Sequence, residues 1–274
     1  MSGLVHWAGG LLVEAVLFPF RGLDPGWGLA ALSLVTGLLF LFVFKWTSNQ
    51  TGIADAKQLV KAHLLELRLY AHDMVLTMRA QKDLFLANLG YIRHSLRPML
   101  VLLIPVLLLL VHLDARYGYR PLAVGETTLL RVRLSPTAPA GAEPKVMLPA
   151  GLTVDAPVLR IQAEREFCYR LRAAAAGGHQ IQVEVGGQTA AKSLQVGGGV
   201  VALSSEVRQP SLLSGFANPA ERPLPPDGAV QSLAVDYPAR EITVAGIGVH
   251  WLLFFFVVSV VPAYLVKGLF GVEA

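Results

Sequence analysis

The chain is poor in charge and has a single cysteine. Of its 274 residues, 15% are charged, and Cys168 alone excludes an intrachain disulfide and a multi-cysteine metal site. No Walker A loop, GxGxxG, HExxH or GxSxG motif occurs, and the seven histidines lack metal-ligand spacing. We therefore expect no enzyme, no cofactor and no metal site, and Cys168, within a strand pattern, is expected to be a small buried apolar side chain.

Three long runs without Asp, Glu, Lys or Arg are present instead, at residues 25–44, 98–113 and 242–266. A transmembrane helix needs about 20 predominantly apolar residues to cross the hydrocarbon layer of about 30 Å. The sequence therefore predicts an integral membrane protein. Its transmembrane helices are expected over residues 25–46, 98–114 and 242–267.

The first 24 residues have no basic region that would mark a signal peptide, and Glu14 interrupts their apolar stretch. The apolar residues of the 3–20 stretch gather mostly on one helical face. This pattern predicts an amphipathic helix lying in the membrane interface over residues 1–24. A fourth membrane-spanning helix is the alternative.

Charge predicts which side faces the cytoplasm. Residues 45–97 carry eight Lys or Arg against four Asp or Glu, and Lys267 follows the third run. Basic residues collect on the cytoplasmic side of a membrane. We therefore expect residues 47–97 and 268–274 in the cytoplasm of a bacterial or archaeal cell, with the N-terminus and residues 115–241 outside. The net charge of +4 fits this distribution, and DNA is not an expected partner.

Residues 47–97 show two helical stripes that predict an antiparallel helical hairpin, or short coiled coil, with Asp73 capping the second helix. The first stripe contains Ile53, Ala56, Val60, Leu64, Leu67 and Ala71, and the second contains Met74, Met78, Gln81, Phe85, Leu89 and Ile92. Their simplest interpretation is the core of the hairpin. The functional alternative is a soft surface that binds a client or partner through Leu64, Leu67, Met74, Met78 and Phe85.

Residues 115–205 switch to short alternating runs separated by Gly pairs, a pattern typical of hairpin-linked strands. About seven strands predict an all-β sandwich of immunoglobulin-like architecture. The expected strands are residues 127–134, 145–148, 157–162, 166–173, 179–185, 188–196 and 200–205. The Pro-rich stretch 206–241 is expected to be an extended tether back to the membrane.

Within the spans, Ser33 and Thr36 share one helical face, and Lys45 follows at the cytoplasmic end. Together these three residues are the candidate for a small hydrophilic groove open to the cytoplasm. The alternatives are hydroxyl groups bonded within their own helix and a lysine that reaches the interface.

The order of elements resembles the core of the Oxa1/YidC/EMC3 superfamily of membrane-protein insertases. The residues that carry the resemblance are 3–20, 27–46, 53–92, 98–113 and 249–266, with Phe44-Lys45-Trp46-Thr47-Ser48-Asn49-Gln50 joining span to hairpin. The resemblance implies an insertase-like or chaperone-like protein that assists insertion or assembly of membrane proteins. Its partners would be membrane lipids, other membrane proteins and a ribosome.

The alternative function is a non-catalytic scaffold or accessory subunit of a larger membrane complex. It would dock its partners through the outer β-domain and the cytoplasmic hairpin. The two functions differ in the groove, because an insertase needs Ser33, Thr36 and Lys45 to be hydrated, whereas a scaffold does not.

Overall fold

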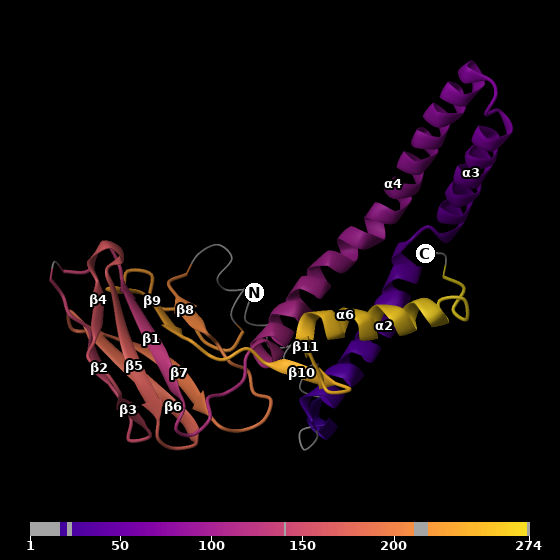
Figure 1. Ribbon diagram of the computed structural model, residues 1–274. Coiled ribbons are helices and arrows are strands. Elements are labelled where there is room, and N and C mark those ends of the chain that lie inside the picture. The colour runs from indigo at the N-terminus through magenta and orange to yellow at the C-terminus, as the bar shows by residue number, and fades with distance from the viewer. Residues whose placement is uncertain (1–16, 21–23, 140, 211–218, 273–274) are drawn as a thin grey trace. The chain divides into compact units, whose positions relative to one another are not determined.

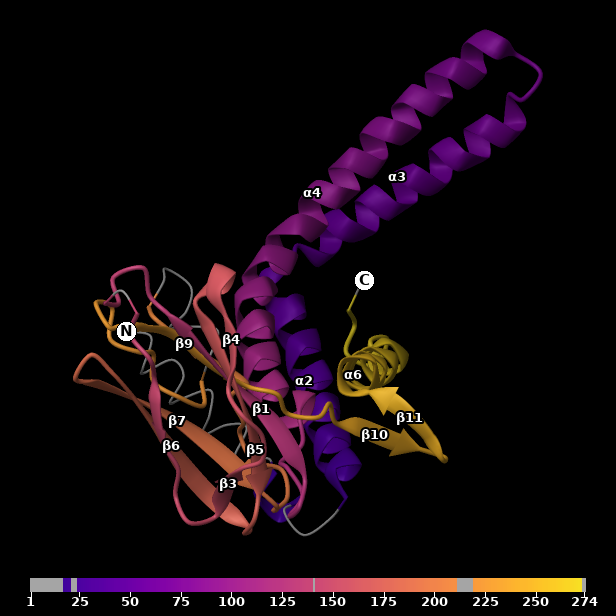
Figure 2. The same cartoon turned by 60° about the vertical axis from the view of Figure 1, so that its left-hand side comes forward.

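The computed structural model describes residues 17–20, 24–139, 141–210 and 219–272 (Figures 1 and 2). The chain divides into two compact units. The β-unit comprises residues 1–28 and 108–251, and the helical unit comprises residues 29–107 and 252–274. Most of the predicted interfacial helix over residues 1–24 lies outside the described residues, which include the short 3-10 helix η1 (Phe18–Phe20).

Two described segments, Pro25–Thr47 and Pro98–Gly118, are long and apolar enough to cross a membrane. The first is helix α2 (Pro25–Thr47), and the second is the last part of helix α4 (Met74–Leu113) with the π-helical turn η2 (Asp114–Gly118). They coincide with the first two predicted spans.

Helices α3 (Gln50–Leu69) and α4 run side by side in both views and form the predicted hairpin (Figures 1 and 2). Capping side chains fix where each arm starts. The Asn49 side chain accepts a hydrogen bond from Gly52 N at 3.0 Å. Asp73 accepts from Val75 N at 2.9 Å and from Leu76 N at 3.1 Å, which confirms the predicted cap.

Helix α4 corrects the predicted boundary between the hairpin and the second span. It is one helix of 40 residues and continues through Pro98 and Pro105. An interior proline removes one backbone hydrogen bond and usually bends or breaks a helix. Here the helix continues on both sides of each proline, so the second arm and the second apolar segment are a single element about 60 Å long at 1.5 Å per residue.

The second arm also corrects the predicted hairpin core. We call the face of α3 that is turned to α4 the seam. The first stripe lies there only in part, because Ile53 is buried and Val60 and Leu67 are half-buried, whereas Leu64 and Ala71 are exposed. On α4, however, the buried positions are Ala80 and Ala87, seven residues apart and therefore on one face. The larger Met and Phe residues of the predicted stripe are exposed instead, so they do not form the core of the hairpin.

The third predicted span is wrong over its first nine residues. Residues 242–250 belong to a hairpin of strands β10 (Glu241–Val244) and β11 (Ile247–His250), and helix α6 (Trp251–Val266) has 16 residues. The turn residues Ala245 and Gly246 have φ angles of 50° and 85°, and two successive positive φ angles are typical of a tight hairpin turn. An uncharged run alone does not distinguish this hairpin from a helix.

The β-unit contains a six-stranded and a three-stranded antiparallel sheet. The larger sheet has the order β3-β5-β1-β9-β8, with β4 also paired to β5, and the smaller has the order β2-β6-β7. The strands are β1 Thr127–Leu134, β2 Lys145–Met147, β3 Leu152–Val154, β4 Leu159–Ile161, β5 Glu166–Ala173, β6 Gly177–Val185, β7 Gln188–Val196, β8 Glu206–Arg208 and β9 Val230–Val235.

Alternation along the strands produces the core. In β1, Leu130 and Val132 are fully buried, while Arg131 between them is exposed. Strands of both sheets contribute to one apolar cluster, with Leu171 and Leu233 from the larger sheet and Ile181 from the smaller. This period of two is the expected result when one face of each sheet is buried.

The predicted extended tether over residues 206–241 is wrong, because part of this segment forms strands of the larger sheet. Strand β9 pairs with both β1 and β8 and therefore lies inside the larger sheet. Leu233 and Val235 of β9 are buried, and Leu224, in the Pro-rich stretch, also joins the apolar cluster. The prolines lie between strands, where a missing N–H removes no ladder bond. Conversely, the predicted strand 200–205 is not a strand.

Candidate partner-binding surfaces

The most exposed apolar surface of the hairpin lies on α4. We call it the α4 stripe, and its members are Met74, Met78, Phe85, Leu89 and Ile92. Their exposed fractions are 77%, 65%, 69%, 54% and 53%, respectively. At 100° per residue these positions share one helical face, separate from the one that holds Ala80 and Ala87. Isolated apolar side chains on a surface are ordinary, but several on one helical face, here interrupted by Gln81, make that face a candidate interaction site.

The residues predicted to bind a client divide between this surface and the seam. Met74, Met78 and Phe85 belong to the stripe, and Leu64 of α3 is 51% exposed. Leu67 is half-buried on the face of α3 that forms the seam. The sequence identified these positions by their spacing, but spacing alone could not distinguish the stripe from the seam because both repeat at helical intervals.

The predicted groove residues Ser33 and Thr36 are buried within the helical unit, with exposed fractions of 0% and 5%. The Ser33 hydroxyl donates to Leu29 O at 2.6 Å, one turn back in its own helix. Next to them, a methyl group on Gly37 would overlap the backbone of Ser259, so α2 and α6 approach each other closely here. These two hydroxyl residues therefore lie where helices pack.

Lys45 lies at the other end of α2 and is engaged within the same unit. Its ammonium donates to Phe270 O at 2.7 Å. The rings of Phe42 and Phe270 also meet edge to face, with centroids 4.9 Å apart. The backbone after α6 is thus attached to α2 by one charged hydrogen bond and one aromatic contact. The structure does not bring Lys45 together with Ser33, which lies three turns away along α2.

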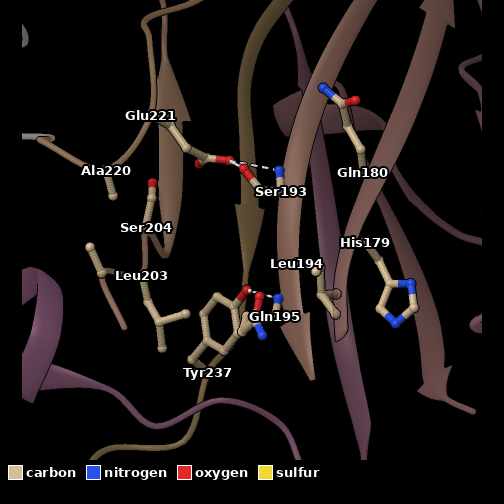
Figure 3. Close-up of a pocket in the computed structure, with 12 residues that line it drawn as sticks. His179, Gln180, Ser193, Leu194, Gln195, Leu203, Ser204, Ala220, Glu221 and Tyr237 are labelled. Atoms are coloured by element: carbon tan, nitrogen blue, oxygen red, sulfur yellow. Dashed lines mark hydrogen bonds between the residues drawn. The ribbon is translucent and has the colours of Figure 1, made fainter. Parts of the chain in front are cut away.

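A polar cluster in the β-unit was not foreseen. Lys192 of β7 has a fully buried side chain, and its ammonium contacts the Glu221 carboxylate at 2.5 Å and Ser204 O at 2.6 Å. Glu221 also accepts from the backbone N–H of Ser193 at 2.6 Å and from its hydroxyl. Figure 3 shows Glu221 reaching toward Ser193 from a separate segment.

The same cluster borders a cavity of about 280 Å³. The Tyr237 hydroxyl lines it and accepts from Gln195 N at 3.0 Å (Figure 3). Burial raises the pKa of Tyr237 to about 12 and lowers the pKa of Lys192, which the Glu221 carboxylate partly opposes. A buried charge is tolerated only when it is paired and hydrogen-bonded. The cluster therefore fastens the segment around Glu221 to β7.

One sequence signal could have found this cluster. Along β7 the inward positions are Ala190, Lys192, Leu194 and Val196. In an alternating strand the inward residues are normally apolar, so a lysine at position 192 is unusual. A lysine there requires a carboxylate from elsewhere in the chain. The sequence does not show which one, because Glu221 lies 29 residues further on.

Cys168 is half-buried in β5, and its thiol lies 3.6 Å from Glu166 Oε1. Burial, and secondarily the neighbouring carboxylate, raises the pKa of this thiol. Among the described residues no group of three or more His, Cys, Asp or Glu side chains could hold a metal ion. Comparison with protein-family models, curated proteins and solved structures finds no match to this chain.

Proposed function

We propose that this protein is a non-catalytic, membrane-bound scaffold or accessory subunit that docks another membrane protein on the α4 stripe. The observation that carries the proposal is the row of five exposed Met, Phe, Leu and Ile side chains on one face of α4. The occupant we propose is an apolar helical segment, because a helix laid along such a row presents its own apolar face at matching intervals.

Magnitudes favour an extended contact. Fully burying one such side chain is worth about 1.5–3 kcal/mol, while association costs about 4–15 kcal/mol. Two buried side chains would contribute about 3–6 kcal/mol, near the low end of that cost, whereas all five would contribute about 7–15 kcal/mol, which is comparable with the whole range. The proposed partner therefore covers the whole stripe. Arg79, Lys82 and Arg93 are exposed on the same helix and suit a partner with acidic flanks.

The proposed membrane arrangement follows from the two long apolar segments and from the charge pattern. We infer that Pro25–Thr47 and Pro98–Gly118 cross the membrane, with the hairpin in the cytoplasm and the β-unit outside. We also propose a sandwich of immunoglobulin-like architecture for the β-unit, supported by two antiparallel sheets that share one apolar cluster. This unit would bind an external partner of the same complex.

A second candidate function is an insertase-like or chaperone-like activity of the Oxa1/YidC/EMC3 type. The methionines of the α4 stripe favour it, because flexible thioether side chains adapt to many apolar sequences. Its clients would be nascent membrane proteins delivered by a ribosome. The scaffold function is favoured by two observations. Ser33 and Thr36 are buried, and Lys45 donates a hydrogen bond to Phe270 O, so none of the three lines an open groove.

Site-directed photocrosslinking in the native host separates the two functions. A photoreactive amino acid is placed at Met78 or Phe85, with exposed Gln58 of α3 as the control position. One dominant adduct from the stripe positions, absent from the control, is the expected result for a dedicated subunit. Many different short-lived adducts would indicate the insertase-like function. Equal and sparse labelling at all three positions would contradict both.

A further inference from the structure

A second cavity in the β-unit has the character of a ligand site. It measures about 570 Å³, within the size range of small-molecule pockets. Its walls come from three separate parts of the chain. These are Leu17, Phe20, Pro25 and Gly28, then Arg116 and Tyr117, and then residues 199–202. Apolar groups make up most of the walls.

Tyr117 supplies the observation that points to a ligand. Its side chain is fully buried, and its hydroxyl has no hydrogen-bond partner among the described residues. The hydroxyl lies against Gly28, where an added Cβ would be 3.0 Å from the oxygen. Both residues line the cavity. Buried polar groups are almost always paired, so a hydroxyl without a protein partner at a cavity wall indicates a partner inside that cavity.

Arg116 brings positive charge to the same cavity. Its guanidinium donates a hydrogen bond of 3.5 Å to His112 O, among other interactions, and a guanidinium carries five N–H donors. Such a group binds phosphate oxygens well. Arg240 donates to the backbone oxygen of Gly199, another lining residue, at 3.4 Å. Asp24 is the nearby acid on the α2 side, and its carboxylate accepts from Gly26 N at 2.8 Å.

The position of the cavity along the chain suggests which ligand it takes. Pro25 and Gly28 begin one of the two long apolar segments, and Arg116 and Tyr117 end the other. If these segments span a membrane, as proposed above, the cavity lies at the boundary between hydrocarbon and water. Phe18 and Trp27, close in sequence to the lining residues Leu17 and Gly28, are exposed, and exposed aromatic residues are typical of that boundary.

We propose that this cavity binds one glycerophospholipid molecule from the bilayer. Its phosphate accepts hydrogen bonds from Arg116, the Tyr117 hydroxyl donates a hydrogen bond to an ester or phosphate oxygen, and its acyl chains lie along the apolar wall. This inference rests on the membrane location in the proposed function but not on the α4 stripe. It explains why a buried tyrosine, rather than a phenylalanine, stands at position 117.

The test is lipid binding by the purified full-length protein in detergent, followed by native mass spectrometry and by thermal unfolding. The probe is phosphatidylglycerol, and diacylglycerol with the same chains is the comparison without phosphate. We expect Tyr117→Phe to bind phosphatidylglycerol about tenfold more weakly, as for one lost charge-assisted hydrogen bond. We expect Arg116→Gln to weaken phosphatidylglycerol binding but not diacylglycerol binding.

The unfolding measurement also distinguishes a ligand contact from a merely structural role. Without lipid, Tyr117→Phe should unfold at the same or a higher temperature than the natural chain, because an unpaired hydroxyl is removed. With phosphatidylglycerol added, the unfolding temperature of the natural chain should rise by more than that of the variant. Tyr169→Phe is the matched control, because the Tyr169 hydroxyl already donates to Pro144 O at 2.9 Å. Removing that hydroxyl should lower the unfolding temperature by the same amount with and without lipid.

Equal lipid-induced shifts in the natural chain and in Tyr117→Phe would overturn the site, as would equal binding of the two lipids. The assay is done in detergent and does not involve the hairpin. Failure here would therefore leave the crosslinking result at Met78 and Phe85 unaffected, and the reverse also holds.

Discussion

The two units of this chain differ in the side chains that they hold in unusual surroundings: the β-unit buries a charged side chain, and the helical unit exposes apolar ones. The β-unit encloses a lysine, and gives it a carboxylate and a carbonyl as partners. The helical unit leaves long apolar side chains on its surface, among them Met74 and Phe85. A buried charge is costly unless it is paired, and an apolar row is costly in water unless it is covered. The β-unit thus pairs the charge that it buries, whereas the helical unit leaves long apolar side chains exposed.

The largest effect should come from breaking the buried pair of the β-unit. Glu221→Ala leaves the Lys192 ammonium buried without its carboxylate, which should cost about 3–5 kcal/mol of unfolding free energy. Hydrogen exchange in the full chain would measure this loss as faster exchange of the backbone amides of β7. Glu164→Ala is the control, because Glu164 pairs with Arg133 on the surface and should cost less than about 1 kcal/mol. Similar losses in both variants would contradict this account of the cluster.

A pH titration tests the same cluster through Tyr237. Its pKa of about 12 in the folded protein exceeds the ordinary value of 10, so this tyrosine contributes stability that is fully present below pH 10. That contribution should be lost between pH 10 and 12, by roughly 3 kcal/mol for a shift of about two pKa units. Melting temperatures of the natural chain should fall more steeply over this range than those of Tyr237→Phe. Parallel curves would show that Tyr237 does not carry the effect.

Within the helical unit, two glycines should respond with opposite signs. Gly37→Ala places a methyl group against the Ser259 backbone and should destabilise the unit by about 1–3 kcal/mol through overpacking. Gly90→Ala on α4 meets nothing within 4 Å and should stabilise it by up to about 1 kcal/mol through helix propensity. Thermal unfolding in one detergent compares them. The same sign for both would mean that α2 and α6 are not in close contact.

The smallest effect should come from the α4 stripe itself. Phe85→Ala is expected to change stability by less than about 0.5 kcal/mol, because the ring is 69% exposed. It should nevertheless abolish most of the partner crosslinking from Met78. Ala80→Leu is the comparison, since it enlarges a buried seam residue and should lower the melting temperature. Unfolding of the protein by Phe85→Ala would place that ring in a core.

Periodicity predicted the elements that repeat regularly. The strands over residues 127–134, 166–173 and 188–196 appear with the predicted bounds. The first and third alternate between a buried and an exposed face over most of their length, and the second alternates over its last four residues. Strand β9 was missed because neighbouring prolines suggested a tether. The β10–β11 hairpin was missed because hydropathy does not distinguish a strand from a helix, and the positive φ angles of Ala245 and Gly246 are seen only in the structure.

The candidate surfaces were predictable only in part. Spacing found Met74, Met78 and Phe85 but did not show that they lie outside the seam, because Ala80 and Ala87 repeat at helical intervals as well. The partnership of Lys192 with Glu221 and the cavity beside Tyr117 depend on segments distant in the sequence. No local pattern contains them.

The length of α6 has a consequence for where in a cell the protein would reside. Sixteen residues extend about 24 Å, while a typical hydrocarbon layer is about 30 Å thick. If α6 crosses the layer, the lipid around it must thin, at a fraction of a kcal/mol for each ångström of hydrophobic mismatch. That elastic deformation is stored in the lipid rather than in the chain. A thinner membrane would relieve it, so bilayer thickness alone would sort this protein among membranes.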